Sequence, residues 1–292
     1  MICNICPRKC NVDREKTQGF CGVNEKIKIS RAALHFYEEP CISGKSGSGT
    51  VFFSGCNLKC VYCQNKIISS GFGKEISEER LEKIFFELKE QGANNINLVT
   101  PDHFVKKTIP VLRSAKENGL DLPIVYNTSG YCDENVIKEL KGLVDIYLTD
   151  FKYFNNETAK KYSKVSDYTA VAKKALKAMV NNVGAPKYFE NGLLKSGVIV
   201  RHLCLPNFLD ESKDILDYLY KTYKNDIIIS IMNQFTPINI ENYPEINRKL
   251  TEKEYQNIVD YANLIGISNA YIQEGDTAKE SFIPSFYELK GV

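Results

Sequence analysis

Apolar residues follow two alternating patterns along the chain from Thr50 onward. Short runs rich in β-branched and aromatic residues predict strands, and these runs lie at residues 50–53, 96–100, 123–127, 144–149, 198–203 and 227–232. Apolar residues spaced three and four apart predict helices between them, at 81–88, 104–118, 136–140, 212–223 and 251–262, with a further long helical stretch ending at Met179. Six strand–helix units in series predict parallel strands joined by right-handed crossovers.

Six units rather than eight predict an open barrel. The expected fold class is therefore α/β, a partial (β/α)6 TIM-like barrel with a cysteine-rich N-terminal extension. We expect the extension at residues 1–49, the barrel at 50–275 and a C-terminal tail at 276–292. The extension has no clear helical period, and its glycine- and serine-rich end, 43–49, predicts a flexible linker. The turn at 190–192 predicts a surface hairpin.

Polar residues follow the predicted strands. A TIM-like barrel carries its chemistry at the carboxyl ends of its strands, so these residues are candidates for a site. Asp150 and Lys152 are the strongest individual candidates, because residues two apart on an extended segment point to one face. Their opposite charges suit a zwitterionic ligand, and the alternative is a simple surface ion pair.

The charge of the chain is nearly balanced, with 38 basic and 36 acidic residues. Nucleic-acid and membrane surfaces usually carry an excess or a block of basic residues, so we expect no nucleic-acid and no membrane partner. No apolar run approaches the ~20 residues needed to span a bilayer. The apolar run at the first residues is also too short and too interrupted to be the apolar part of a signal peptide. We therefore expect a soluble, cytoplasmic protein.

Three of the ten cysteines, Cys56, Cys60 and Cys63, lie in one short segment after the first predicted strand. Cysteine thiolates hold iron–sulfur clusters, and a cubane normally takes four. Three at this spacing can hold three irons of a [4Fe–4S] cluster and leave the fourth open to an exogenous ligand. The alternatives are weaker, because a structural zinc site needs four ligands and disulfides need an oxidising compartment.

A second group of cysteines lies in the extension and has the spacing Cx2Cx3Cx10C. Its members are Cys3, Cys6, Cys10 and Cys21. Four thiolates within about twenty residues suit a closed tetrahedral zinc site or an auxiliary iron–sulfur cluster, and the spacing does not decide between them. The other three cysteines are isolated in the sequence, and they are Cys41, Cys132 and Cys204. An isolated cysteine is more often a small buried hydrophobic residue than a metal ligand.

The cysteine triplet, with an aromatic residue before its last cysteine, resembles the motif of the radical SAM superfamily. Further segments resemble those of pyruvate formate-lyase activating enzyme-like members, at residues 3–10, 38–44, 126–130 and 150–153. The resemblance implies a partial barrel and the cofactor S-adenosylmethionine, whose amino and carboxylate groups chelate the open iron. An electron from the cluster then cleaves the sulfonium and releases a 5′-deoxyadenosyl radical.

The resemblance also implies which residues meet the cofactor. Tyr62 would lend its backbone to the adenine. Asp150 and Lys152 match the DxK motif, whose residues contact the cofactor. His202 lies at a strand end, where a hydrogen-bonding or proton-transfer role is open, and we include it among the candidate cofactor-binding residues.

One segment departs from the family pattern. Activating enzymes usually carry Gly-Gly-Glu after the second strand, where it binds the methionyl amine, and this chain has Val99-Thr100-Pro101-Asp102 there. Asp102 is one candidate to replace the missing acceptor. Asn127 together with Thr128 is the other.

The leading hypothesis is a radical SAM oxidoreductase that cleaves S-adenosylmethionine reductively and abstracts hydrogen from a substrate; its catalytic residues are not identified. The substrate is either a backbone glycine of a partner glycyl radical enzyme or a small molecule or peptide that is modified directly. A flavodoxin- or ferredoxin-type protein is the expected electron donor. A non-catalytic iron–sulfur electron carrier is a weaker alternative, because it accounts neither for six barrel units nor for an open iron.

Overall fold

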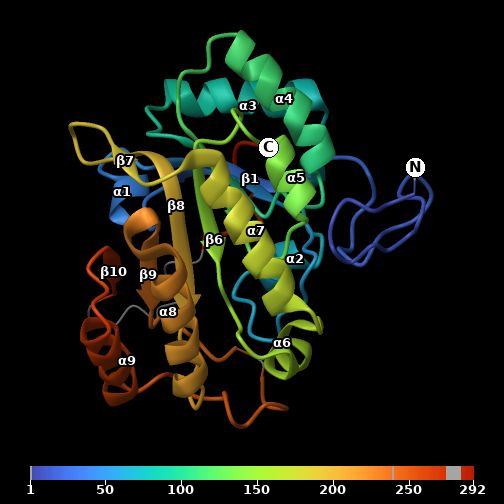
Figure 1. Cartoon of the computed structure of the whole chain (residues 1–292). Helices are drawn as coiled ribbons and strands as arrows, with labels where there is room; N and C mark the ends of the chain where they lie inside the picture. The colour runs from blue at the N-terminus through green and yellow to red at the C-terminus, as the bar shows by residue number, and fades with distance from the viewer. Residues whose placement is uncertain (1, 239, 274–283) are drawn as a thin grey trace.

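A single mixed sheet forms the centre of the molecule. The computed structural model describes residues 2–238, 240–273 and 284–292. The sheet has the strand order β10-β9-β8-β6-β5-β4-β2-β1-β3, and β7 pairs with β8 outside this order (Figure 1). The strands are β1 (Lys28–His35), β2 (Ser48–Phe53), β3 (Lys74–Glu75), β4 (Ile96–Val99), β5 (Ile124–Thr128), β6 (Ile146–Asp150), β7 (Lys187–Tyr188), β8 (Leu194–Leu203), β9 (Ile228–Met232) and β10 (Ala270–Ile272).

The six predicted strands are all present, as β2, β4, β5, β6, β8 and β9, and each pairs with the next in parallel. The predicted hairpin is also confirmed, because β7 and β8 pair antiparallel across the turn at 190–192. The sheet is open, with β10 at one edge and β1 and β3 at the other. The predicted α/β fold with a partial TIM-like barrel is therefore confirmed, although the sequence patterns missed β1, β3 and β10.

Helices cover the outer face of the sheet, and α7 packs against β6 and β8 (Figure 1). The helices are α1 (Pro40–Ser43), α2 (Lys66–Ser69), α3 (Glu78–Glu90), α4 (Val105–Glu117), α5 (Glu134–Glu139), α6 (Asn156–Ser163), α7 (Tyr168–Val183), α8 (Leu209–Tyr223) and α9 (Glu252–Leu264). The long helical stretch predicted to end at Met179 is two helices, because Lys164 adopts a left-handed backbone with φ of 59° and ends α6. Among the residues described, none of the helices combines the length and the apolar character that a membrane span requires.

The inner face of the sheet is apolar near the start of its strands. Successive side chains on a strand alternate between faces, so residues of four neighbouring strands meet on the side away from the helices. There they pack with Cys41 and Ile42 of α1. The segment that carries α1 joins the end of β1 to the start of β2. Helix α1 therefore closes the N-terminal end of the barrel. The packed strand residues are Val125, Ile146, Leu148, Ile199 and Ile228.

The inner face becomes polar one step farther along the same strands. Each of the strands β5, β6, β8 and β9 has a polar residue two positions after its last apolar inner residue. These polar residues are, in the same order, Asn127, Asp150, Arg201 and Ser230. Because a step of two residues keeps a side chain on the same face, these four side chains share the barrel interior. The change from apolar to polar positions marks the floor of the candidate site.

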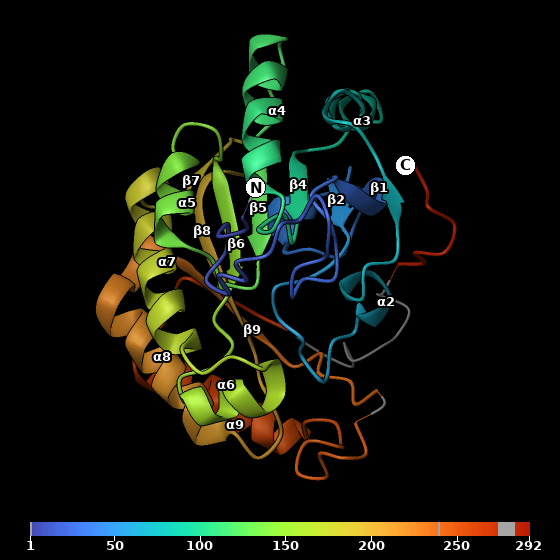
Figure 2. The ribbon, with the colours of Figure 1, turned by 90° about the vertical axis from the view of Figure 1, so that its right-hand side faces the viewer.

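The N-terminal extension contributes directly to the barrel. Its residues 28–35 form β1, which pairs antiparallel with β2. The flexible linker predicted at 43–49 is wrong, because Ser48 and Gly49 begin β2 and a Cβ on Gly49 would lie only 2.8 Å from the Cβ of Ala93. Figures 1 and 2 both show the first residues, in blue, as an irregular lobe on the outside of the barrel. The predicted domain boundary at 49/50 stays a prediction, and the boundary at 275/276 lies outside the described residues.

Candidate functional site: a cysteine loop beside a buried charge network

The cysteine triplet lies in the loop that follows β2, at the carboxyl end of the parallel strands. The loop leaves the strand through Gly55, whose φ is 87°. A Cβ on Gly55 would lie 2.8 Å from the carbonyl oxygen of Cys21, so this turn requires glycine. All ten cysteines of the chain are free thiols. Cys56, Cys60 and Cys63 are therefore available as ligands.

Cys60 is linked to a chain of hydroxyl groups. Its Sγ lies 2.9 Å from Oγ of Ser163, and that oxygen lies 2.7 Å from the Tyr153 hydroxyl. The Tyr153 hydroxyl in turn lies 2.5 Å from the hydroxyl of Tyr62. A hydrogen-bonding group beside a cysteine ligand orients it and tunes the potential of a bound cluster. The side chain of Tyr62 thus supports Cys60 through two neighbours, which leaves its backbone for the adenine contact that the resemblance implies.

The N-terminal extension holds the cysteine loop from outside the barrel. The amide of Cys56 donates to the carbonyl of Cys21 at 3.1 Å. Arg8 donates from Nε to the carbonyl of Asn57 at 2.8 Å and from Nη1 to the carbonyl of Lys164 at 2.6 Å. One guanidinium group therefore joins the cysteine loop to the end of α6.

The thiols of the triplet form a donor set that fits an iron–sulfur cluster. Burial raises the pKa of Cys56 and of Cys60, and the neighbouring thiols of the triplet add to the effect. Thiolates in such a place are stable only beside positive charge, which bound iron would supply. Within the described ranges, no three or more His, Cys, Asp or Glu side chains are arranged around a single metal ion. A cubane does not need that arrangement, because each thiolate binds a different iron.

The four cysteines of the extension lie near one another. Burial raises the pKa of Cys21; the charge of Arg14 opposes this, and Cys3 and Cys10 add to it. The sulfurs of Cys21 and Cys10 both lie within 4 Å of the position that a Cβ on Gly19 would take, at 3.5 and 3.7 Å. In the part of the chain that the structure describes, they do not surround a single ion. A zinc or an auxiliary cluster held by Cys3, Cys6, Cys10 and Cys21 stays a prediction.

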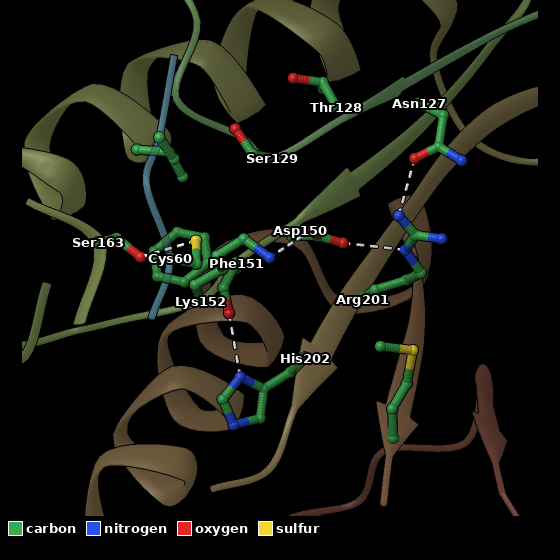
Figure 3. A network of polar contacts seen from close by, with 12 residues as sticks. Cys60, Asn127, Thr128, Ser129, Asp150, Phe151, Lys152, Ser163, Arg201 and His202 are labelled. Carbon is green, nitrogen blue, oxygen red and sulfur yellow. Dashed lines mark hydrogen bonds and ion pairs between the residues drawn. The ribbon is translucent and has the colours of Figure 1, made fainter. Parts of the chain in front are cut away.

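Asp150 is the centre of a buried charge network on the inner face of the barrel (Figure 3). Nζ of Lys152 lies 2.6 Å from its Oδ2, and Nε of Arg201 donates to its Oδ1 at 2.9 Å. Arg201 also donates to Oδ1 of Asn127 at 2.8 Å and pairs with Oε2 of Glu38 at 3.2 Å. The side chains of Lys152 and Asp150 are only 16% and 17% exposed. The alternative of a surface ion pair is therefore wrong.

These groups keep one another charged. Burial acts to raise the pKa of Asp150, but the Lys152 ammonium and the Arg201 guanidinium outweigh it and the pKa is lowered. Burial acts to lower the pKa of Lys152, but Asp150 and then Cys60 outweigh it and this pKa is raised. Because Cys60 influences Lys152, the network reaches the cysteine loop. A carboxylate and an ammonium group are thus held side by side next to the triplet, which is the arrangement that a zwitterionic ligand requires.

Thr128 and His202 project away from this network (Figure 3). Each directly follows an inner residue on its strand, and successive residues alternate between faces. The Thr128 hydroxyl donates to the Asp102 carboxylate at 2.9 and 3.0 Å. Nδ1 of His202 lies 3.0 Å from the carbonyl oxygen of Phe151, and its Nε2 lies 2.9 Å from Oγ of Ser212. The structure does not bring either side chain to Asp150, and their contacts with a cofactor stay predictions.

Asp102 is engaged on the same outer face as Thr128. It also accepts a hydrogen bond from the Tyr126 hydroxyl at 3.2 Å. Burial raises the pKa of Asp102 to about 6, although these hydroxyl donors oppose the shift. Its oxygens already have partners on the helix side of the sheet, so this placement favours Asn127 over Asp102 as a replacement for the family's missing acceptor.

Two residues of the network were not selected from the sequence as cofactor-binding residues. Arg201 directly precedes His202, and the alternation of faces along β8 would have selected it, since Asn127 and Asp150 occupy inner positions on neighbouring strands. Glu38 comes from the extension, where it begins the family-like segment 38–44, but the sequence assigned it no role. Its Oε1 accepts from Nδ2 of Asn97 at 3.0 Å and from Nδ2 of Asn127 at 3.2 Å.

A cavity of about 500 Å³ opens beside the network, between the two edges of the open sheet. One side is formed by His35, the last residue of β1, and Phe36 after it, and the other by Tyr271 and Ile272 of β10. Its lining also includes Gln64, which follows the last cysteine of the triplet. The cavity therefore connects the cysteine loop with the barrel interior.

Comparison with known proteins yields relatives that are similar in sequence and solved structures that are similar in fold. An uncharacterized protein of Methanocaldococcus jannaschii is 33% identical over 281 residues, which cover 92% of this chain and 76% of that protein. The pyruvate formate-lyase-activating enzyme of Clostridium pasteurianum is 26% identical over 223 residues, which cover 70% of this chain and 82% of that enzyme. The solved structure of HydG, a maturase of the FeFe-hydrogenase, has a TM-score of 0.52 at 15% identity; 78% of this chain matches 51% of that chain, about half its length. This last likeness concerns the fold alone.

A family model described as "Radical SAM superfamily" matches residues 50–219, more than half of the chain. The matched range begins in β2 and contains the cysteine triplet, Asp150 and Arg201. Members of this family use a [4Fe–4S] cluster and S-adenosylmethionine, and the donor set of the triplet fits such a cluster. The chain therefore belongs to the radical SAM superfamily.

Proposed function

We propose that this protein is an oxidoreductase that cleaves S-adenosylmethionine reductively and abstracts a hydrogen atom from a substrate. The observation that carries the proposal is the placement of three free thiols, Cys56, Cys60 and Cys63, beside the buried pair of Asp150 and Lys152. The thiols would hold the [4Fe–4S] cluster, which supplies the electron for the cleavage when it is bound.

The charge network would bind and orient the methionyl end of the cofactor. Asp150 offers a carboxylate to an ammonium group, and Lys152 offers an ammonium to a carboxylate. Arg201 holds Asp150 in place from the neighbouring strand β8, and Asn127 of β5 holds Arg201 by accepting a hydrogen bond from it. Because these side chains are largely buried, their interactions with a ligand would be little screened by water.

The first candidate substrate is a backbone glycine of a partner glycyl radical enzyme. It is supported by the similarity to the pyruvate formate-lyase-activating enzyme of Clostridium pasteurianum. The second candidate is a small molecule or peptide that is modified directly, and the cavity of about 500 Å³ supports a small molecule. In either case we expect the electron to come from a flavodoxin- or ferredoxin-type protein.

The proposal is tested by reconstituting the cluster without oxygen. The wild-type protein should show a [4Fe–4S] signal in electron paramagnetic resonance that changes when S-adenosylmethionine is added, and with dithionite it should form 5′-deoxyadenosine. Replacement of Cys56, Cys60 or Cys63 by Ala should abolish both the signal and the product, because no other cysteine lies in this loop. A reconstituted wild-type protein that forms no 5′-deoxyadenosine would contradict the proposal.

A further inference from the structure

In the described part of the chain, Glu39 places a carboxylate oxygen without a hydrogen-bond partner in the wall of the cavity. The residue is only 9% exposed and lines the cavity. Its Oε2 is buried and, among the described residues, has no hydrogen-bond partner. A buried carboxylate oxygen without a donor is costly. A ligand that brings a hydrogen-bond donor into the cavity would remove this cost.

Carboxylates outnumber cations around Glu39, so a cationic ligand would balance the charge. Arg201 already pairs with Glu38 and Asp150, and Lys152 pairs with Asp150. Within the described part of this region, three carboxylates therefore share two cations, and Glu39 makes an ion pair with neither of them, although the Arg201 charge acts on it. Burial raises the pKa of Glu39, although the Arg201 charge opposes the shift. A cation bound beside Glu39 would favour its charged form.

The remaining walls suit an organic cation rather than a hydrated metal ion. Aromatic and apolar side chains line the same cavity, and they are Phe36, Tyr37, Phe52, Met232 and Tyr271. Aromatic faces attract ammonium groups that carry an apolar body. A volume of about 500 Å³ also lies within the usual range for small-ligand sites.

We infer that this cavity binds a small organic cation, with an alkylammonium group on Glu39 and an apolar body against the aromatic walls. The inference names the substrate class of the proposed radical enzyme, and so it rests on that proposed function. Glu39 is then a specificity-determining residue, contributed by the N-terminal extension rather than by the strands of the barrel. Its position next to Glu38 links substrate binding to the network that holds Asp150.

The test compares phenethylammonium with phenethyl alcohol, which share a ring and a chain and differ in charge. Each is titrated calorimetrically into anaerobic, cluster-loaded protein with saturating S-adenosylmethionine and no reductant. The wild-type protein should bind the amine at least about tenfold more tightly than the alcohol, since a charge-assisted contact is at stake. Glu39→Gln should weaken amine binding roughly ten- to hundredfold and change alcohol binding little. The matched control is Glu190→Gln, in the exposed hairpin turn, which should change neither affinity.

Three results would overturn the inference. The first is that the wild-type protein binds the two probes equally or does not bind the amine. This result needs no variant, so it counts even if Glu39→Gln fails to fold. The second is unchanged amine affinity in a folded Glu39→Gln protein. The third is displacement of S-adenosylmethionine by the amine, because the site would then be that of the cofactor. Since no electron is added, these results are independent of the radical activity: amine binding without any 5′-deoxyadenosine formation would contradict the proposed function alone.

Discussion

Asp150 accepts hydrogen bonds from two cations of the barrel interior, and so its charge decides how both are held. Loss of a charge-assisted hydrogen bond to a bound ligand typically costs about 1.5–3 kcal/mol, or roughly ten- to a hundredfold in affinity. We expect Asp150→Asn and Lys152→Met to weaken S-adenosylmethionine binding by that factor while the iron content stays intact. Equilibrium binding and iron analysis on the reconstituted variants measure both quantities.

The control for this pair is Lys83→Met, because Lys83 is exposed on the face of α3 opposite its buried side chains. It should change neither quantity. If both network variants bind the cofactor as the wild-type protein does, then the network only stabilises the barrel. In that case the free energy of unfolding would fall in the two variants, since breaking a buried ion pair leaves an unpaired charge.

His202 makes stability depend on pH. Burial lowers the pKa of His202 to about 4, although the Phe151 carbonyl opposes the shift. The folded state therefore holds a proton on this ring less readily than the unfolded chain, whose histidine pKa is about 6.5. The stabilising contribution is complete above that value and is lost as the pH falls from about 6.5 towards 4.

From this shift we expect the free energy of unfolding of the wild-type protein to fall by about 2 kcal/mol more than that of His202→Gln between pH 7.5 and pH 5. Gln keeps groups that can bond to Phe151 and Ser212 but does not titrate. Urea unfolding of both proteins at the two pH values measures the difference. Parallel losses in the two proteins would show that His202 does not titrate across this interval.

At the scale of elements, the backbone that follows β5 lies very close to the carboxyl end of β6. Gly130 follows β5 with φ of 77°, and a Cβ there would lie 2.2 Å from the carbonyl oxygen of Asp150. Glycine is therefore required at this position for two reasons: its backbone is left-handed, and a side chain would collide with β6. The approach sets where Asp150 leaves its strand.

Gly130→Ala should consequently displace Asp150 as well as destabilise the fold. Gly142→Ala is a matched control, because Gly142 has φ of 79° and no atom within 4 Å of its Cβ position. The control should lose about 1–2 kcal/mol from the left-handed backbone alone. We expect Gly130→Ala to lose clearly more stability in urea unfolding and to bind S-adenosylmethionine more weakly. Equal losses in the two variants would mean that β6 moves aside without cost.

At the scale of the whole molecule, the N-terminal extension holds both ends of the barrel. Its residues 28–43 supply strand β1, which lies between β2 and the edge strand β3, and close the N-terminal end through α1. Its first residues hold the cysteine loop through Arg8 and Cys21. A metal in this lobe would therefore act on the site through the position of the loop.

If a structural zinc is held by the extension, a Cys10→Ala variant should lose more stability than chemistry, because metal binding contributes folding free energy. Elemental analysis of the wild-type protein should then find about one zinc per chain beside the iron of one cluster. Iron at roughly twice the level of one cluster, with no zinc, would establish an auxiliary cluster instead.

Sequence patterns were sufficient where the evidence is local. The six parallel strands, the hairpin at 190–192 and the helix at 251–262 all appear where their patterns predicted them. Strands β1 and β10 were missed, because β1 lies in a turn-rich segment and β10 has only the three residues Ala270–Ile272. Strand β10 is too short for its pattern to stand out, and β1, although eight residues long, does not alternate between buried and exposed positions.

The sequence by itself determined the order of the barrel units, the loop that carries the three cysteines and the family that they indicate. These depend on periodicity and spacing, which are properties of neighbouring residues. Only the tertiary structure decided which polar residues share the interior: Glu38 meets Arg201 across 163 positions of sequence, while Thr128 and His202 turn to the opposite face. Such meetings depend on how strands and α1 pack in space, because a contact between distant segments leaves no periodic trace in either of them.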